Sequence, residues 1–297
     1  MNTTHAQIAK NLPSWMWKLG SQAFIKKDFP RHLFIETTAT CNLSCSYCPR
    51  EKIRQDMDFE LFRQIIDEAH RYGPRSFSLH LFGEPLLYKR IFEAVGYIKR
   101  RNKRNTVLLT TNGTKLNDCI DDFVSCGIDQ AYWTWRPEAR FRESTLLRLK
   151  QWGKFRVRFI DEITPEEARR EWADWPNVEG RNIHNYGGTI SVEKFSATPT
   201  KNGQRHPCYH LWLAPAVAWN GKILICCSDP HQKEVIGQFP QSSIAEAWNS
   251  DQMNSVRASH LRGEYEGICK DCDVWKSFPS MHFNFQLKGN KNEKKLH

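Results

Sequence analysis

Three cysteines lie close together in the segment Cys41-Asn-Leu-Ser-Cys45-Ser-Tyr-Cys48, directly after an apolar, strand-like stretch. These thiols can converge on one point only if the backbone loops around it. Disulfides cannot use three thiols evenly, and a tetrahedral zinc ion needs a fourth ligand. A [4Fe–4S] cluster can accept three thiolates and leave one iron open for a substrate or cofactor. The spacing therefore favours such a cluster over a structural zinc site with a distant fourth ligand.

A second group of cysteines lies toward the C-terminus. Cys269 and Cys272 form a CxxC pair, while Cys208 and the adjacent Cys226 and Cys227 flank an Asn-Gly dipeptide, which is a strong hairpin signal. Four thiolates from a hairpin and from a loop after a helix suit a fully ligated site. On spacing alone, zinc and an iron–sulfur cluster are equally favoured here.

The elements that must position these cysteines follow an alternating pattern. Strand-like apolar segments occupy residues 32–38, 76–81, 106–111, 130–135, 155–160 and 178–185, and segments with helical apolar spacing occupy residues 59–72, 90–101, 117–126, 143–152 and 165–175. This alternation predicts a parallel sheet with right-handed crossovers. Six strands are too few for a complete barrel, so we expect the α/β class and a partial (β/α)6 TIM-like barrel. The first group of cysteines would lie at the strand ends, where such barrels carry active sites.

The alternation stops after about residue 190, and a different organisation follows. A polar connection precedes a hairpin at Asn220-Gly221, and a helix then begins with a capping box formed by Ser243 and Glu246. We therefore divide the chain into four parts. These are an N-terminal extension (1–30), the partial barrel (31–190), a small β-hairpin and helix domain (191–285) and a basic, disordered tail (286–297).

Composition and charge limit the possible functions. The chain has 297 residues, ten cysteines and a formal net charge of +10. It has no run of about 18 apolar residues and no secretory signal, so we expect a cytoplasmic protein with no membrane partner. In that reducing compartment the cysteines indicate metal or redox chemistry. The basic residues cluster at 99–104 and 288–297, where a helix end and a disordered tail explain them more readily than nucleic-acid binding does. An anionic substrate would also suit the charge.

The segment CNLSCSYC, with Tyr47 before its last cysteine, resembles the signature of the radical S-adenosylmethionine (SAM) superfamily. Gly83-Glu84-Pro85 resembles that family's GGEP motif, although Phe82 replaces a glycine. The segment TTNG at residues 110–113 resembles another family motif, and a threonine in the fourth strand stands where relatives often have a ribose-contacting serine. The resemblance extends over about residues 31–280. It implies that SAM contacts Tyr47, Gly83, Glu84, Pro85, Thr111, Asn112 and Thr134, and that a [4Fe–4S] cluster is held by Cys41, Cys45 and Cys48.

The C-terminal cysteines resemble the SPASM/twitch extension of the same superfamily. The resemblance implies an auxiliary [4Fe–4S] cluster held by Cys208, Cys226, Cys269 and Cys272. Cys227 would then point to the other face of its strand, because side chains alternate along a strand. No cysteine follows Cys272, so the pattern is typical of the shorter, one-cluster twitch form.

The resemblance also implies an activity. A radical SAM oxidoreductase cleaves SAM reductively to a 5′-deoxyadenosyl radical, which abstracts hydrogen from a substrate. We expect a small polar substrate such as a sugar, an aminocyclitol or a nucleotide, with the auxiliary cluster assisting electron transfer. A flavodoxin or ferredoxin would donate electrons. The alternatives are a radical SAM maturase that modifies a peptide or protein and, in another class, a zinc-stabilised nucleic-acid-binding protein. The sequence identifies no catalytic acid or base.

A few other residues lead to further expectations. His184 follows the sixth predicted strand and either lines a substrate cavity or belongs to a simple turn. Trp133 and Trp135 are typical of core residues, although their position near a strand end would also suit a pocket lining. Cys119 and Cys126 lie on one face of a predicted helix, where we expect them to act as buried small hydrophobic residues.

Overall fold

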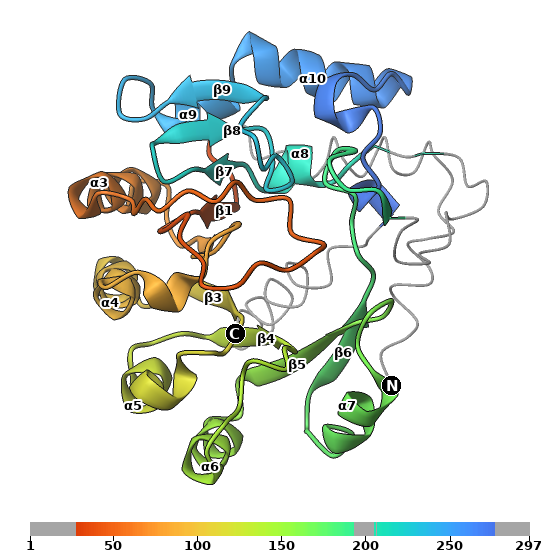
Figure 1. Ribbon diagram of the computed structural model, residues 1–297. Helices are drawn as coiled ribbons and strands as arrows, with labels where there is room; N and C mark the ends of the chain where they lie inside the picture. Colours follow the sequence, from red (N-terminus) through yellow and green to blue (C-terminus); the bar gives the residue numbers. More distant parts are fainter. Residues whose placement is uncertain (1–27, 193–204, 206, 277–297) are drawn as a thin grey trace, which may run out of the picture.

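A single curved sheet organises the protein. The computed structural model describes residues 28–192, 205 and 207–276, and within these ranges nine strands pair in the order β6-β5-β4-β3-β2-β1-β7-β8-β9. The first six are parallel neighbours and form an arc that is open on one side (Figure 1). They are β1 (His32–Ile35), β2 (Ser76–Ser78), β3 (Thr106–Thr111), β4 (Gln130–Thr134), β5 (Phe155–Ile160) and β6 (Val178–Arg181). The predicted partial (β/α)6 barrel is confirmed.

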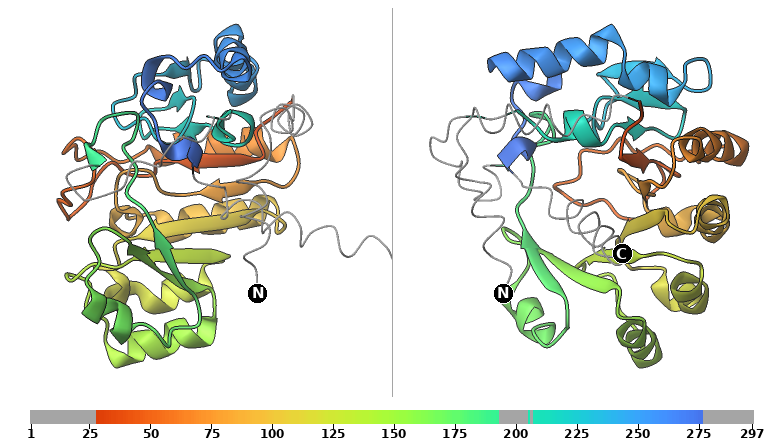
Figure 2. Two further views of the ribbon diagram at one scale, coloured as in Figure 1. Left: turned by 90° about the vertical axis from the view of Figure 1, so that its right-hand side faces the viewer. Right: turned by 180° about the vertical axis from the view of Figure 1, so that it is seen from behind.

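Helices cover the outer side of this arc (Figures 1 and 2). They are α3 (Phe59–His70), α4 (Ile91–Arg101), α5 (Leu116–Ser125), α6 (Glu143–Trp152) and α7 (Glu166–Glu171). In α3, Phe62, Ile65, Ile66 and Ala69 repeat at helical spacing and are fully buried, so this stripe packs against the sheet. Among the described residues, no helix is both long enough and apolar enough to cross a membrane.

The C-terminal unit extends the barrel sheet. Strand β7 (Ala216–Val217) pairs in parallel with β1, and β8 (Lys222–Leu224) and β9 (Val235–Gln238) continue the sheet in antiparallel fashion. The predicted hairpin joins β7 to β8, and Gly221 takes a φ of +84° there, a conformation that favours glycine. Three helices complete the unit: α8 (His210–Leu213), α9 (Ile244–Trp248) and α10 (Asp251–Arg262). The sequence predicted the hairpin but not its continuity with the barrel.

Two buried carboxylates from the barrel hold the C-terminal unit in place. Glu68 of α3 accepts hydrogen bonds from the backbone N–H groups of Ile244 and Ala245, both at 3.0 Å, at the positive end of α9. Glu36, directly after β1, accepts from the N–H groups of Trp219 and Phe82, both at 3.4 Å. Burial raises the pKa of Glu36 to about 7 because these long hydrogen bonds only partly replace water. The position of the C-terminal unit is therefore fixed by the barrel itself.

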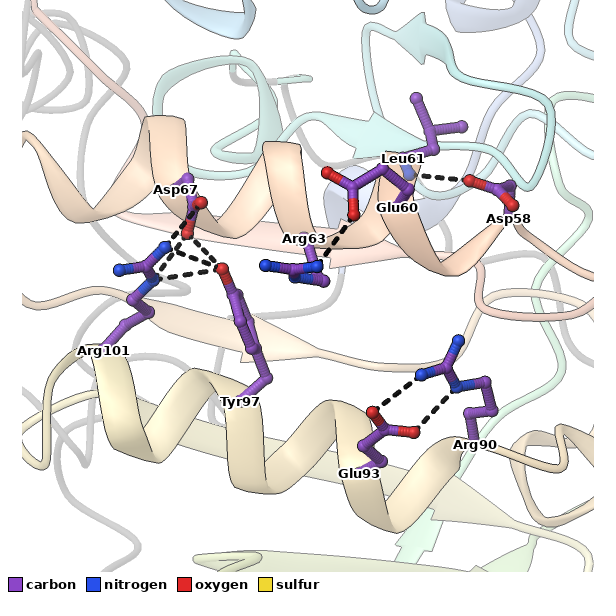
Figure 3. A network of polar contacts seen from close by, with 9 residues as sticks. All are labelled: Asp58, Glu60, Leu61, Arg63, Asp67, Arg90, Glu93, Tyr97 and Arg101. Carbon is purple, nitrogen blue, oxygen red and sulfur yellow. Dashed lines mark hydrogen bonds and ion pairs between the residues drawn. The ribbon is translucent and has the colours of Figure 1, made fainter.

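The basic cluster at residues 99–104 ends α4, as predicted. Asp67 of α3 accepts from the hydroxyl of Tyr97 at 2.7 Å and pairs with Arg101 at 2.6 Å (Figure 3). Lys99 pairs with Asp129 at 2.5 Å. These ion pairs tie neighbouring surface elements together, and exposed pairs of this kind contribute about 1 kcal/mol at most.

Some expected boundaries and environments are corrected. Helix α7 ends at Glu171 instead of continuing to residue 175, because the chain turns to bury the rings of Trp172 and Trp175 against the core. Cys119 and Cys126 are only half-buried, and α5 is kinked at Cys119, so the prediction of two buried thiols was wrong. The expected N-terminal extension (1–30) lies almost entirely outside the described residues, as does all of the tail (286–297).

Candidate active site between two groups of cysteines

Cys41, Cys45 and Cys48 lie on one loop, at the barrel end where the strands terminate. The N–H of Cys48 donates to the carbonyl of Cys45 at 3.1 Å and closes a turn. The Arg50 guanidinium donates to the carbonyls of Cys41 at 3.2 Å and Leu43 at 2.9 Å. Arg50 therefore links both ends of the loop and holds it curved.

The thiols of this loop suit a cluster better than a single ion. All three are half-buried, and each lies within electrostatic reach of the others. Burial raises the pKa of Cys41 and of Cys48, so these thiols ionise only when a cation compensates the charge. In the part of the chain that the structure describes, no three His, Cys, Asp or Glu side chains are arranged for one metal ion. The loop therefore offers three neighbouring thiols, all half-buried, as a candidate donor set.

Gly83 allows the loop after β2 to lie directly against the loop that carries the cysteines. A Cβ atom at Gly83 would overlap the carbonyl oxygen of Thr38 and lie 2.7 Å from its carbonyl carbon. The next residue, Glu84, donates its N–H to the carbonyl of Thr40 at 2.8 Å. Thr40, which accepts this hydrogen bond, is the residue immediately before Cys41. Gly83 is thus required by close packing, without any unusual backbone conformation.

Glu84 joins the loop after β2 to the end of β3. Its carboxylate accepts from the hydroxyl of Thr111 at 2.7 Å, the N–H of Asn112 at 2.6 Å and the N–H of Leu86 at 3.1 Å. Burial raises its pKa to about 7 despite these three donors. Asn112 in turn places its side-chain nitrogen 3.8 Å from the sulfur of Cys41. Pro85 begins the short 3₁₀ helix η1 (Pro85–Leu87). Four predicted SAM contacts therefore form one connected group behind the cysteine loop.

A cavity of about 540 Å³ lies against the ends of the barrel strands and part of the C-terminal unit. This volume lies in the range of small-molecule sites. Of the predicted SAM contacts, Tyr47 and Thr134 line it, and His184 lines it as well. Phe82, which replaces the expected glycine, also lines the cavity and packs edge-on against Tyr186, with ring centroids 5.8 Å apart. Phe82 therefore shapes the cavity wall.

The C-terminal cysteines divide between two cavities. Cys208, Cys226, Cys269 and Cys272 all line a second, smaller cavity, whereas Cys227 lines the large one. The two cysteines diverge as expected, but the expected strand does not reach them: β8 ends at Leu224, and Cys226 and Cys227 lie in the bend and turn that follow. Burial raises the pKa of Cys227 and of Cys269 to about 12. The structure thus brings four of the predicted ligands to one small cavity and separates Cys227 from them.

Three residues belong to the linings of both cavities. His210 of α8, Ser228 and Val274 line the large cavity and also the smaller one with the four thiols. His210 is buried, and its ring lies 6.2 Å from that of Phe34 on β1. The two sites are thus separated by a thin wall made mainly by the C-terminal unit.

The sequence interpretation missed most of the polar lining of the large cavity. Arg158 lies on β5, a mainly apolar strand that also contains Arg156. It is buried, donates from Nε to Glu179 at 2.6 Å and stacks over Tyr132 at 4.2 Å. Burial lowers its pKa. Arg136 and Arg181, which follow or end neighbouring strands, line the cavity too. A charged residue inside an apolar strand of a barrel was the signal that could have revealed this lining.

The tryptophans near the end of β4 belong to the core, as is typical of this residue type, and do not line the cavity. Trp133 is buried between Phe141 and Trp172, with ring centroids 4.7 Å away in each case, and its Nε1 donates to the carbonyl of Asn112 at 3.0 Å. Trp135 is half-buried and is absent from the lining of the described cavity. Trp133 supports the end of β3 from behind, so it positions the site without contacting the cavity.

Comparison with known families gives two matches along the chain. Residues 35–132 match the model of the radical SAM superfamily, and residues 201–273 match the model of the SPASM iron–sulfur cluster-binding domain. The first match contains the three-cysteine loop and Glu84. The second contains the four cysteines that share the smaller cavity.

Individual proteins are similar over most of the chain. The S-adenosyl-L-methionine-dependent 2-deoxy-scyllo-inosamine dehydrogenase of Niallia circulans is 23% identical, over 80% of this chain and 91% of its own. The solved structure of BtrN with AdoMet and 2-DOIA is 21% identical and covers 82% of this chain and 92% of its own, with a TM-score of 0.65. Streptococcus suis SuiB bound to the precursor peptide SuiA is 15% identical, covers 88% of this chain and 74% of its own, and has a TM-score of 0.61. These structural likenesses show a shared fold.

Proposed function

This chain is a radical SAM enzyme with a SPASM domain, and we propose that it oxidises a small polar substrate by two electrons in the cavity between its two groups of cysteines. The observation that carries the proposal is the position of that cavity. It is lined by Tyr47 from the three-cysteine loop and by Cys227 and Ser228 beside the other group. The family matches argue against the zinc-stabilised nucleic-acid-binding protein.

The residues present fit the cofactors that the family implies. Cys41, Cys45 and Cys48 would hold the SAM-binding [4Fe–4S] cluster, and the four thiols of the smaller cavity would hold one auxiliary [4Fe–4S] cluster. When bound, the first cluster and SAM supply a 5′-deoxyadenosyl radical that removes a hydrogen atom from the substrate. Tyr47 and Thr134 line the cavity from the side of the three-cysteine loop and β4, and are proposed to contact SAM. A flavodoxin or ferredoxin is proposed as the electron donor.

An alcohol that becomes a carbonyl loses a hydrogen atom, a proton and an electron. We assign the proton to His184, which lines the cavity and holds its Nδ1 3.6 Å from the carboxylate of Asp273. Asp273 also accepts from the N–H of Asn185 at 3.0 Å, so the carboxylate is fixed. A fixed carboxylate orients the ring and stabilises the imidazolium that forms. The electron would leave toward the four thiols, whose cavity shares His210, Ser228 and Val274 with the substrate cavity.

Deuterium transfer tests this function. Reduced protein is incubated with SAM and with polyols deuterated at their carbinol carbons, and mass spectrometry follows 5′-deoxyadenosine and the carbonyl product. We expect wild type to place deuterium in 5′-deoxyadenosine and to form product. His184→Gln should still transfer deuterium but form product about 100-fold more slowly or worse, a typical loss for general-base catalysis.

His70→Gln, at the exposed end of α3, is the matched control and should behave like wild type. If deuterium reached 5′-deoxyadenosine from a deuterated peptide but from none of the polyols, the result would support the maturase alternative and contradict the proposed oxidation. Wild-type product formation by His184→Gln would remove His184 as the proton acceptor.

A further inference from the structure

The charged side chains that line the large cavity are unbalanced. Three guanidinium groups, those of Arg136, Arg158 and Arg181, face it, whereas the lining contains one carboxylate, that of Glu179. Neighbouring cationic side chains repel one another unless an anion lies between them. The lining of the described cavity therefore has an excess of positive charge before any ligand binds.

Carboxylates behind the wall do not remove this excess. Glu36 contacts the lining through the N–H of Phe82, and its other oxygen accepts from the N–H of Trp219. Asp273 accepts from the N–H of Asn185 and lies beside His184. Within the described ranges, each of these carboxylates thus has its own partners and makes no ion pair with a lining arginine.

The three arginines have different surroundings. Arg158 is paired with Glu179, which neutralises it locally. Arg136 lies over the ring of Tyr47, 5.0 Å from its centroid, in the three-cysteine loop. In the part of the chain that the structure describes, its buried Nε meets no hydrogen-bond acceptor. SAM carries one carboxylate, and Arg136 is the guanidinium placed beside the loop that would hold SAM. Of the three lining guanidinium groups, that of Arg181 is the one to which neither Glu179 nor the SAM carboxylate is assigned.

Arg181 is the last residue of β6 and lines the large cavity. Its Nη2 donates to the hydroxyl of Tyr186 at 3.4 Å, and its buried Nε has no hydrogen-bond partner among the described residues. Among the ion pairs of the described residues, none joins Arg181 to a carboxylate. A partly buried guanidinium with free donors is the usual anchor for a phosphate or carboxylate, because its planar fork matches their oxygens.

We propose that the cavity selects a substrate that carries one phosphate or carboxylate group, and that Arg181 binds this group. The proposal rests on the proposed function only in taking this cavity as the substrate site. A cationic amine, as in the substrate named for the Niallia circulans relative, would meet like charge here. The chain's formal net charge of +10 would in addition attract an anionic substrate toward the site.

Binding measurements test the proposal without requiring catalysis. The anaerobically purified protein, with its clusters and saturating SAM, is titrated by calorimetry with glucose 6-phosphate, glucuronate, glucose and glucosamine at one ionic strength. We expect one or both anionic sugars to bind at least about tenfold more tightly than glucose, and glucosamine to bind no better than glucose. The phosphate and carboxylate probes separate the two possible anionic groups.

Three variants locate the binding group. Arg181→Gln should weaken binding of the anionic probe about tenfold or more and leave SAM binding intact, which also shows that the variant is folded. Arg181→Lys keeps the charge and should restore part of the affinity. Arg170→Gln removes the same charge from the exposed surface of α7 and should bind like wild type.

Several results would overturn the proposal. These are glucosamine or glucose binding as tightly as the anionic sugars, neither anion binding, or Arg181→Gln binding them with wild-type affinity. If the anionic sugar binds as expected but no deuterium reaches 5′-deoxyadenosine from any polyol, the anion site stands and the proposed oxidation fails. If instead deuterium reached 5′-deoxyadenosine from a neutral or amino polyol, and the titrations showed no preference for anionic sugars, the oxidation would be supported and the anion site excluded.

Discussion

Replacing Cys45 with alanine is expected to abolish the release of 5′-deoxyadenosine by the reduced protein, whereas replacing Cys269 should leave that release and remove substrate oxidation. The two effects differ because the thiols belong to different groups: Cys45 lies on the loop after β1, whereas Cys269 lines the smaller cavity together with three other cysteines. The first loop offers three thiols, so losing one leaves too few to hold a cluster. Cys269 lies in the other site, beyond the wall that contains His210 and Ser228.

The measurement is chromatography of 5′-deoxyadenosine and oxidised product in the same reaction. Both losses should exceed the change of about 10- to 100-fold that is typical when a residue that only contacts a metal ligand is replaced. Cys126→Ala removes a half-buried thiol directly after α5, outside both groups, and should change neither product. Release of 5′-deoxyadenosine by Cys45→Ala at the wild-type rate would show that the triad is not the SAM-cleaving site.

Replacing Gly83 with alanine is expected to disrupt the cluster loop although no ligand changes. The added methyl group would overlap the carbonyl of Thr38. This steric overlap can be removed only if the backbone that leads into Cys41 moves. Overpacking of this kind typically costs about 1–3 kcal/mol, and the contact here is with backbone that cannot rotate away. We expect lower iron content and a lower denaturant midpoint, measured on anaerobically reconstituted protein.

Gly96→Ala is the matched control for this substitution. Gly96 lies in α4, and the nearest atom to an added Cβ would be the flexible end of Arg100 at 3.1 Å. The same change there should leave the iron content unaltered and raise helix stability by up to about 1 kcal/mol. If Gly83→Ala kept full iron content and stability, the close packing of the two loops would not position the cluster site.

The barrel could be predicted from the sequence because its strands and helices carry clear periodic patterns. The spacing of Cys41, Cys45 and Cys48, and of Cys269 and Cys272, likewise indicated that each set lies on one loop, because residues so close in sequence stay close in space. The approach of Cys208 and Cys226 to Cys269 is a long-range contact, and only the resemblance to a known extension indicated it. Strand β7 (Ala216–Val217) was different, because two residues show no periodicity, and its pairing with β1 is a long-range contact. The continuity of the sheet, which places Tyr47 of the three-cysteine loop and Cys227 of the C-terminal unit on the lining of one cavity, could therefore not be predicted.

The cavity lining shows a similar limit. Arg136 and Arg181 have no motif and belong to different strand ends, so only the curvature of the sheet brings them to one cavity. The sequence also did not decide whether Trp133 belongs to the core or lines the pocket. Its position near a strand end does not reveal that the ring faces the helices. Asp273 and His184 are distant in sequence, and their proximity depends on the C-terminal unit folding back over β6.

Iron and sulfide analysis of the anaerobically reconstituted protein tests the central proposal, two clusters on two separate groups of thiols, most directly. We predict about eight iron and eight sulfide per chain with little zinc, falling to about four of each when Cys41, Cys45 and Cys48 are all replaced by alanine. Zinc without iron, or an iron content that does not change in this triple variant, would contradict the proposal.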